Sequence, residues 1–97
     1  MIRLSIIFPC YNEAENIPVL IEGCIKHLDK YNSILEIILV NNGSNDDTEM
    51  LFKKLVNKNK LFKIVRVDKN QGYGHGILKG LSKANGKYIG WMHADLQ

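Results

Sequence analysis

The sequence has little cysteine and no long apolar run, and each of these shortages excludes a class of protein. Two cysteines, Cys10 and Cys24, are too few for a disulfide framework and lack the spacing of a metal site. We therefore expect buried free thiols in a reducing compartment. No apolar stretch approaches the roughly 20 residues of a membrane-spanning helix. The apolar opening is too short for a secretory signal peptide and is broken by Pro9, so we expect a cytoplasmic protein.

The sequence also lacks a large excess of charge of either sign. The net charge of +3 is mild, and the basic residues are spread along the chain. One loose group is explained by the solvated face of a helix: Lys53, Lys54, Lys58, Lys60 and Lys63. We expect no nucleic-acid partner. The 97 residues contain no repeat and no low-complexity tract, and they are enough for one domain with a modest core.

What the sequence does contain is an alternation of strands and helices. Apolar, β-branched runs predict four strands, at residues 2–8, 35–40, 62–67 and 88–92. Pro9 is expected to end the first strand, because proline cannot donate to a ladder.

Three amphipathic segments separate the strands. The first begins near Asn16, a candidate N-cap, with Pro18 in its first turn. Ser44 and Asp47 resemble a capping box before the second helix, and Asn85-Gly86 is a stop signal after the third. The apolar stripes are Ile17, Leu20, Ile21, Cys24, Ile25 and Leu28, then Leu51, Phe52, Leu55 and Val56, then Ile77, Leu78, Leu81 and Ala84.

This order of elements predicts an α/β fold, a Rossmann-like three-layer sandwich with a mainly parallel sheet. In the common strand order 3-2-1-4, ligands bind beyond the carboxyl ends of the strands, where the order reverses. Polar residues follow three strands: 11–13 after the first, 41–47 after the second, and His93, Asp95 and Gln97 after the fourth. We expect these clusters to meet at one edge of the sheet.

The pieces in this order resemble the family 2 glycosyltransferases of the GT-A fold, including the dolichol-phosphate mannose synthase-like branch. The resemblance covers the whole chain and rests on five segments: Ile7–Glu13, Val40–Thr48, Asn70–Gly76, Gly86–Tyr88 and His93–Gln97. Each segment alone is weak, and together they are specific. The resemblance implies that the chain is the N-terminal half of a GT-A fold.

The resemblance also implies a nucleotide pocket. Pro9, Tyr11 and Glu13 would line the base and ribose, with Val40 and Asn42 closing the pocket. Tyr11 offers an apolar face, and the Glu13 carboxylate can accept from N–H and hydroxyl groups. The alternatives are that Pro9 only ends a strand and that Tyr11 belongs to the core.

A divalent cation is implied at the end of the fourth strand. His93-Ala94-Asp95 looks like the family's Asp-x-Asp motif, with Ala94 and Asp95 beside the nucleotide, and Gln97 matches a further metal-site residue of the mannose synthase-like branch. Mg²⁺ or Mn²⁺ held by oxygen ligands would neutralise the charge on the departing diphosphate. His93 either ligates the metal, hydrogen-bonds a phosphate or packs against other residues. For Asp95, the alternative to a metal ligand is a helix cap or an exposed acid.

The sequence departs from the family at two places. Asn41-Asn42 stands where an acidic pair is usual, and His93 stands where the first acid of the metal motif is usual. The amide oxygen of Asn42 can still accept a base N–H. The glycine-rich segment 72–76 has the wrong spacing for a dinucleotide fingerprint, so its backbone is expected near the diphosphate or sugar. An NAD-binding domain would need an acid where the two asparagines stand.

The sequence therefore predicts a metal-dependent glycosyltransferase that uses a UDP- or GDP-linked donor and a hydroxyl or polyprenyl phosphate acceptor. Residues 1–97 would be the nucleotide-sugar-binding half, ending at the metal motif and inactive alone, without acceptor site or identified catalytic base. The alternative is a non-catalytic nucleotide-binding or regulatory module. We also expect a homodimer through the exposed edge of residues 88–92, and membrane contact only through segments of a longer parent or a lipid acceptor.

Overall fold

The structure is a computed structural model that describes residues 1–44, 47–56 and 59–92. Its strands are β1 (Leu4–Cys10), β2 (Leu35–Asn42), β3 (Phe62–Val67) and β4 (Tyr88–Trp91). Its helices are α1 (Ile17–Leu28), the 3₁₀ turn η1 (Asp29–Tyr31), α2 (Thr48–Val56) and α3 (Tyr73–Ser82). None of the helices in these ranges has the length and apolar character needed to cross a membrane.

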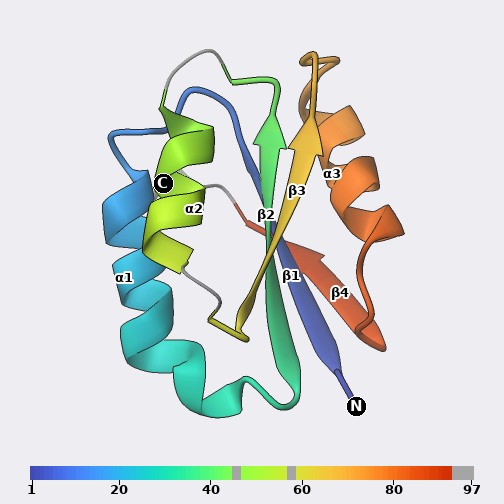
Figure 1. The fold of residues 1–97 in the computed structure, drawn as a ribbon. Coiled ribbons are helices and arrows are strands. Elements are labelled where there is room, and N and C mark those ends of the chain that lie inside the picture. The colour runs from blue at the N-terminus through green and yellow to red at the C-terminus, as the bar shows by residue number, and fades with distance from the viewer. Residues whose placement is uncertain (45–46, 57–58, 93–97) are drawn as a thin grey trace.

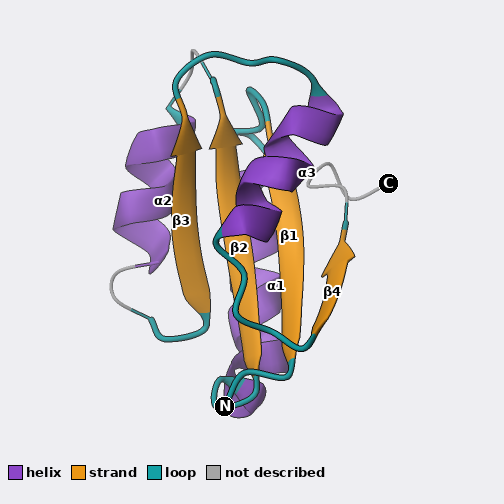
Figure 2. Cartoon of the chain, turned by 90° about the vertical axis from the view of Figure 1, so that its right-hand side faces the viewer, coloured by secondary structure: helices purple, strands orange, loops and turns teal. Residues whose placement is uncertain are grey.

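The four strands form one sheet in the order β3-β2-β1-β4, and every pair is parallel. Helices α1 and α2 cover one face of the sheet and α3 covers the other, as Figure 1 shows from the side and Figure 2 after a quarter turn. The predicted Rossmann-like three-layer sandwich with strand order 3-2-1-4 is confirmed. Strands β1 and β4, first and last in the chain, are neighbours.

Two apolar clusters fill the spaces between the layers. The cluster under α1 and α2 includes Phe8, Ile37, Leu39 and Phe52, and the cluster on the α3 side consists of Ile7, Ile38, Val40, Val65 and Val67. Neighbouring residues of β1 and β2 go to opposite clusters because side chains alternate along a strand. Every residue of β2 is buried, so this strand is the centre of the sheet.

Pro9 does not end β1, and that prediction is wrong. The strand continues to Cys10, which pairs with Asn41 of β2. The Ile7 carbonyl accepts from the Met92 N–H on the β4 side, and successive residues of a strand face alternate sides. Pro9 therefore also faces β4, beyond the last described pair of Ile7 with Trp91. Its missing N–H costs no hydrogen bond to β2.

Helix α3 packs through glycines, and the expected stripe is only partly right: Ala84 packs against the cluster on the α3 side, but the two leucines do not. Gly76 and Gly80 are buried, whereas Leu78 is 63% and Leu81 is 42% exposed. A Cβ built on Gly80 would lie 2.7 Å from Ile7 Cγ2 and 3.0 Å from Val40 Cγ2. The helix lies so close to β1 and β2 that only glycine fits, and its leucines are turned outward.

A buried carboxylate holds the segment that leads into β4. Glu36 of β2 accepts from the Ser5 hydroxyl at 2.6 Å and from the Asn85 N–H, and Gly86 N–H donates to Ser5 Oγ at 2.8 Å. Lys63 of β3 lies 3.4 Å from the other Glu36 oxygen and donates to the Lys83 carbonyl at 2.8 Å. Burial raises the pKa of Glu36, but these donors and the lysine charge lower it more. The network fixes the start of β4.

We predict that Gly80→Ala destabilises the chain by about 1–3 kcal/mol, because the added methyl overfills a close helix–sheet contact. Gly74→Ala on the same helix is the matched control, since its Cβ would meet no atom within 4 Å. That control should be neutral or stabilise by up to about 1 kcal/mol. Urea unfolding followed by circular dichroism measures both, and equal effects of the two substitutions would contradict the close packing.

Glu36→Gln should lower the free energy of unfolding at pH 7 by about 1–3 kcal/mol, because Lys63 and the buried donors lose their charged partner. The pKa of Glu36 is lower in the folded chain than in the unfolded chain. Its contribution is therefore present above the pKa of an unfolded glutamate and is lost as pH falls through the folded pKa. Urea titrations at pH 7 and pH 3 should show the difference from wild type shrinking at pH 3. Glu22→Gln, on the exposed side of α1, is the control and should leave the free energy of unfolding at pH 7 nearly unchanged.

Candidate functional site at the carboxyl edge of the sheet

The loops that follow β1 and β2 are joined to each other. The Asn12 N–H donates to Ser44 Oγ at 3.0 Å, and the Ser44 hydroxyl lies 3.4 Å from the Cys10 carbonyl oxygen, to which it donates. Asn12 has φ of 50°, a left-handed conformation that asparagine tolerates better than most residues. Ser44 thus bridges loops and does not cap α2, which begins only at Thr48, so the capping-box prediction is wrong.

Two of the predicted nucleotide residues lie in the first of these loops. Tyr11 is 45% exposed, which excludes the interpretation of a core tyrosine. Glu13 lies at the start of α1, where its Oε2 accepts from Asn16 Nδ2 at 3.0 Å and its carbonyl accepts from the Asn16 and Ile17 N–H groups. Asn16 occupies the predicted N-cap position, but its side chain makes no capping hydrogen bond. It orients Glu13 instead.

The other two predicted pocket residues near β1 and β2 are covered. Pro9 is buried, and Val40 is fully buried under Gly80 of α3. A direct contact of either side chain with a base stays a prediction. In the described structure Val40 supports the helix that forms this side of the site.

Asn42 lies beneath the first turn of α3 and is 2% exposed. Its Nδ2 donates to the Gly72 carbonyl at 3.2 Å, while its Oδ1 has no hydrogen-bond partner among the described residues. A Cβ on Gly76 would lie 2.8 Å from Asn42 Nδ2, so the helix backbone sits directly on the amide. An unpaired buried acceptor costs about 1–3 kcal/mol, and a ligand N–H would satisfy it.

Asn41 points to the opposite face of the sheet. Its Nδ2 donates to Glu49 Oε1 of α2 at 2.9 Å, and its Oδ1 accepts from the Ser44 N–H at 3.1 Å. The sequence analysis treated the two asparagines as one polar cluster. It named neither Ser44 nor Glu49 as a residue of the binding site. Because successive side chains of a strand point to opposite faces of the sheet, the sequence already contained the signal that Asn41 and Asn42 face different sides of β2.

The turn after β3 also reaches this edge. Gly43 has φ of 73°, and a Cβ there would collide with the backbone of Lys69 and Asn70. Asn70 Oδ1 in turn accepts from the Gly72 N–H at 2.7 Å, just before α3. The loops after β1, β2 and β3 therefore form one connected rim. For the loop after β3, the sequence analysis had placed only the glycine-rich segment 72–76 near the ligand.

Strand β4 runs parallel to β1, toward the same edge. Trp91 pairs with Ile7, and the Met92 N–H donates to the Ile7 carbonyl at 2.9 Å. The predicted metal and nucleotide residues His93, Ala94, Asp95 and Gln97 lie outside the described residues. Among residues 1–44, 47–56 and 59–92, no three His, Cys, Asp or Glu side chains are grouped as metal ligands.

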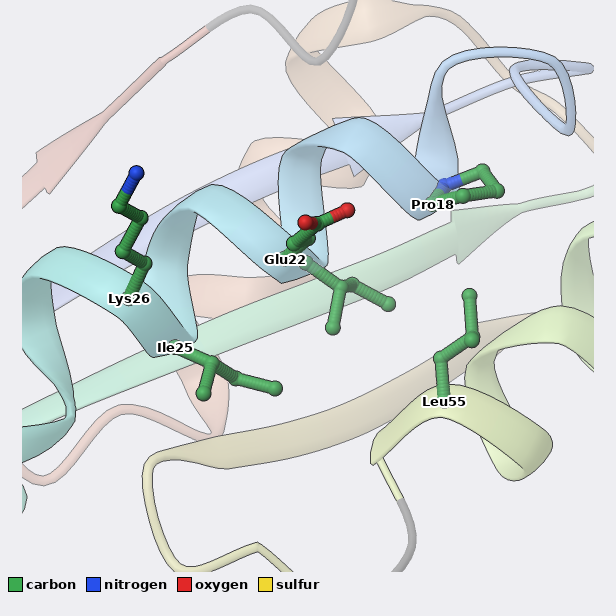
Figure 3. Close-up of a pocket in the computed structure, with 6 residues that line it drawn as sticks. Pro18, Glu22, Ile25, Lys26 and Leu55 are labelled. Atoms are coloured by element: carbon green, nitrogen blue, oxygen red, sulfur yellow. The ribbon is translucent and has the colours of Figure 1, made fainter.

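A surface hollow lies elsewhere. It has a volume of about 490 Å³ and separates α1 from α2, with Leu55 of α2 facing Ile25 and Pro18 of α1 and with Glu22 and Lys26 beside them (Figure 3). None of its lining residues belongs to the predicted site. Its surface is mostly apolar, which does not suit a nucleoside diphosphate.

The two cysteines take no part in this chemistry. Both are buried and free, as predicted. Burial, with a smaller effect of the Glu13 charge, raises the pKa of Cys10 to about 12, and burial raises that of Cys24 to about 11. Both thiols are protonated at neutral pH, so neither is a nucleophile.

The rim of loops after successive parallel strands, closed by a glycine-rich helix start, brings together residues of three of the five sequence segments: Ile7–Glu13, Val40–Thr48 and Asn70–Gly76. The family model described as glycosyl transferase family 2 matches residues 5–97. The chain belongs to glycosyl transferase family 2. The predicted family is thus confirmed.

Two relatives and one solved structure illustrate the family likeness. The chain is 37% identical over 96 residues to an undecaprenyl-phosphate 4-deoxy-4-formamido-L-arabinose transferase of Pectobacterium atrosepticum, covering 98% of this chain and 29% of the relative. It is 32% identical over 100 residues to a dolichyl-phosphate beta-glucosyltransferase of Saccharomyces cerevisiae, covering 97% of this chain and 30% of the relative. The mannosyltransferase PcManGT of Pyrobaculum calidifontis, solved with GDP-Man and Mn²⁺, superposes with a TM-score of 0.76 at 26% identity, covering 96% of this chain and 27% of that one. The chain therefore spans less than a third of the length of these family 2 proteins.

Proposed function

We propose that residues 1–97 form the nucleotide-sugar-binding half of a glycosyltransferase that moves a sugar from a UDP- or GDP-linked donor to a polyprenyl phosphate. The observation that carries the proposal is the unpaired, buried Oδ1 of Asn42 at the rim where the loops after β1, β2 and β3 meet. A nucleobase N–H is a natural partner for that oxygen. Asn42 is also the residue that the family resemblance assigns to the base.

The base reaches Asn42 when the first turn of α3 shifts outward. The Asn42 amide lies under Gly76, and the donor bond to the Gly72 carbonyl fixes which amide atom is the acceptor. Segment 72–76 contains three glycines, whose backbone adapts at low cost. The first N–H groups of α3, left without helical partners, then face the diphosphate or the sugar.

Tyr11 and Glu13 form the other side of the proposed pocket. The exposed Tyr11 ring can lie against the base or ribose, and Glu13, oriented by Asn16, can accept from a ribose hydroxyl. Both residues follow β1, next to the end of β2, so they face the same rim as Asn42.

Mg²⁺ or Mn²⁺ is the proposed cofactor, with Asp95, Gln97 and His93 as its ligands. One finding supports this: the structural relative PcManGT was solved with Mn²⁺. A divalent cation held by these residues would stabilise the charge on the leaving diphosphate. Carboxylate and amide oxygens suit both ions, and a histidine ligand favours Mn²⁺ over Mg²⁺.

A lipid-linked acceptor is supported by the relatives. The names of the Pectobacterium and Saccharomyces enzymes each specify a polyprenyl phosphate, undecaprenyl phosphate and dolichyl phosphate, and they specify different sugars. The shared chemistry is transfer to a phosphate carried by a membrane lipid. We therefore propose that the complete protein works at a membrane surface, through its acceptor or through segments outside residues 1–97.

Isothermal titration of the 97-residue chain with UDP and GDP, with and without Mn²⁺, tests the proposal. We expect one nucleotide to bind, more tightly with Mn²⁺, and Asp95→Ala to weaken that binding about tenfold or more, which corresponds to about 1.4 kcal/mol. Asp29→Ala, at the opposite end of α1, is the matched control and should bind like wild type. We also expect no sugar transfer to polyprenyl phosphate by this chain alone.

The outcomes separate the alternatives. Tight binding that needs no metal and survives Asp95→Ala would favour a non-catalytic nucleotide-binding module. Binding of neither nucleotide would contradict both proposals, and transfer by the 97 residues would contradict the assignment of a donor-binding half only.

We also propose that the 97-residue chain forms a homodimer through β4. This edge strand is short, carries no charge and exposes Tyr88, Ile89 and Trp91, whereas β3 at the other edge carries Lys63 and Arg66. Charged residues on an edge discourage pairing, and their absence favours it. The N–H groups of Tyr88 and Met92 bond to β1, so by alternation those of Ile89 and Trp91 face away from it.

Ile89→Pro should make the chain monomeric, because it removes an outward N–H without breaking the ladder to β1. Ile89→Ala is the matched control: it shortens the side chain but keeps the N–H, and should leave the dimer intact. Light scattering coupled to size exclusion measures the mass of each variant. A monomeric wild-type chain at high concentration would refute the dimer.

A further inference from the structure

We propose that Asn41 is a positioning residue for nucleotide binding: together with Glu49 it holds the backbone that carries Tyr11 and Glu13. The inference rests on the proposed nucleotide site and adds two residues to it. Asn41 stands in the first position of the usual acidic pair, and its role explains why an amide is needed there.

The proposal begins with the direction of the two asparagines. Asn42 lies on the α3 side of the sheet, under Gly76, whereas Asn41 bonds to Glu49 on the α2 side. Both are buried, at 2% and 5% exposure, so each must have a hydrogen-bonding purpose. Asn41 lies away from the face that holds the base, and any effect it has on a nucleotide passes through other residues.

A chain of hydrogen bonds leads from Asn41 to the nucleotide side of the rim. Asn41 Oδ1 accepts from the Ser44 N–H at 3.1 Å, and Ser44 Oγ accepts from the Asn12 N–H at 3.0 Å. Asn12 is the left-handed residue between Tyr11 and Glu13. Fixing its N–H fixes the direction in which the chain leaves β1, and with it the placement of the two neighbouring side chains.

Glu49 makes the amide necessary. Its Oε1 accepts from Asn41 Nδ2 at 2.9 Å, and its other oxygen lies 3.8 Å from the ammonium of the exposed Lys53. An aspartate at position 41 would place a second carboxylate against Glu49 and would have no N–H to donate. The two residues therefore form a matched pair.

A charge-exchange experiment tests the pair. Asn41→Asp should weaken binding of UDP or GDP, whichever the wild-type chain binds more tightly, by about tenfold, a change of about 1.4 kcal/mol. In the double variant Asn41→Asp/Glu49→Gln the new glutamine can donate to the new aspartate, so the hydrogen bond returns with reversed polarity. We expect its affinity to recover to within about threefold of wild type, as a coupled pair requires.

Two further variants isolate the pair. Glu49→Gln alone keeps an acceptor oxygen for Asn41 and should therefore weaken nucleotide binding less than Asn41→Asp does. Lys53→Gln removes only the exposed ion pair and should change nothing, since such pairs contribute about 0–1 kcal/mol. Amide NMR of Asn12 and Ser44 follows the relay without ligand: both signals should move in Asn41→Asp and return in the double variant.

The outcomes are decisive in both directions. Nucleotide affinity unchanged in Asn41→Asp, with only the melting temperature lowered, would make Asn41 a purely structural residue and overturn the proposal. Weakened binding that the double variant does not recover would overturn the pairing with Glu49. If the wild-type chain binds neither UDP nor GDP, the proposed function fails and this role fails with it, while the NMR signals still show separately whether the hydrogen-bond relay exists.

Discussion

The central constraint in this structure is that β2 is buried along its whole length yet carries three polar side chains, Glu36, Asn41 and Asn42. A buried polar group without a partner is costly, so each of these residues recruits one from another element. Glu36 holds the segment before β4, Asn41 holds α2 and the loop at Ser44, and Asn42 holds the start of α3. One strand thereby positions the elements around the proposed site.

The same constraint changes the meaning of the missing acids. A pair of asparagines where the family resemblance implies an acidic pair suggests lost activity when the sequence is considered alone. In the structure each amide donates to an acceptor, Glu49 or the Gly72 carbonyl, that an aspartate would repel. The amides thus belong to a self-consistent set of partners. Only the Oδ1 of Asn42 is left unpaired within the described part of the chain, and it faces the helix that forms one side of the rim.

Much of the fold could be predicted from patterns in the sequence. Apolar, β-branched runs located the four strands to within two residues of their observed bounds. The errors have physical causes. Pro9 was expected to end β1, but its missing N–H faces the side where pairing with β4 has ended. The stripe of α3 was assigned to Leu78 and Leu81, but the tight approach of helix to sheet selects Gly76 and Gly80. Ser44 was assigned to a helix cap, but it bonds to a loop 32 residues away.

The sequence by itself determined the order of elements, the parallel sheet with its order 3-2-1-4, and the edge at which polar residues gather. The elements follow from periodicity, which short windows of the chain carry, and the sheet follows from the general rules for the handedness and common order of parallel strands. The tertiary structure alone decided the partner of each polar residue: Glu49 for Asn41, Gly72 for Asn42, and Asn85 for Glu36. Two of these three partners lie at least 30 residues away. The choice depends on which donors and acceptors the packed helices bring within 3.5 Å of β2, and no local pattern records that distance.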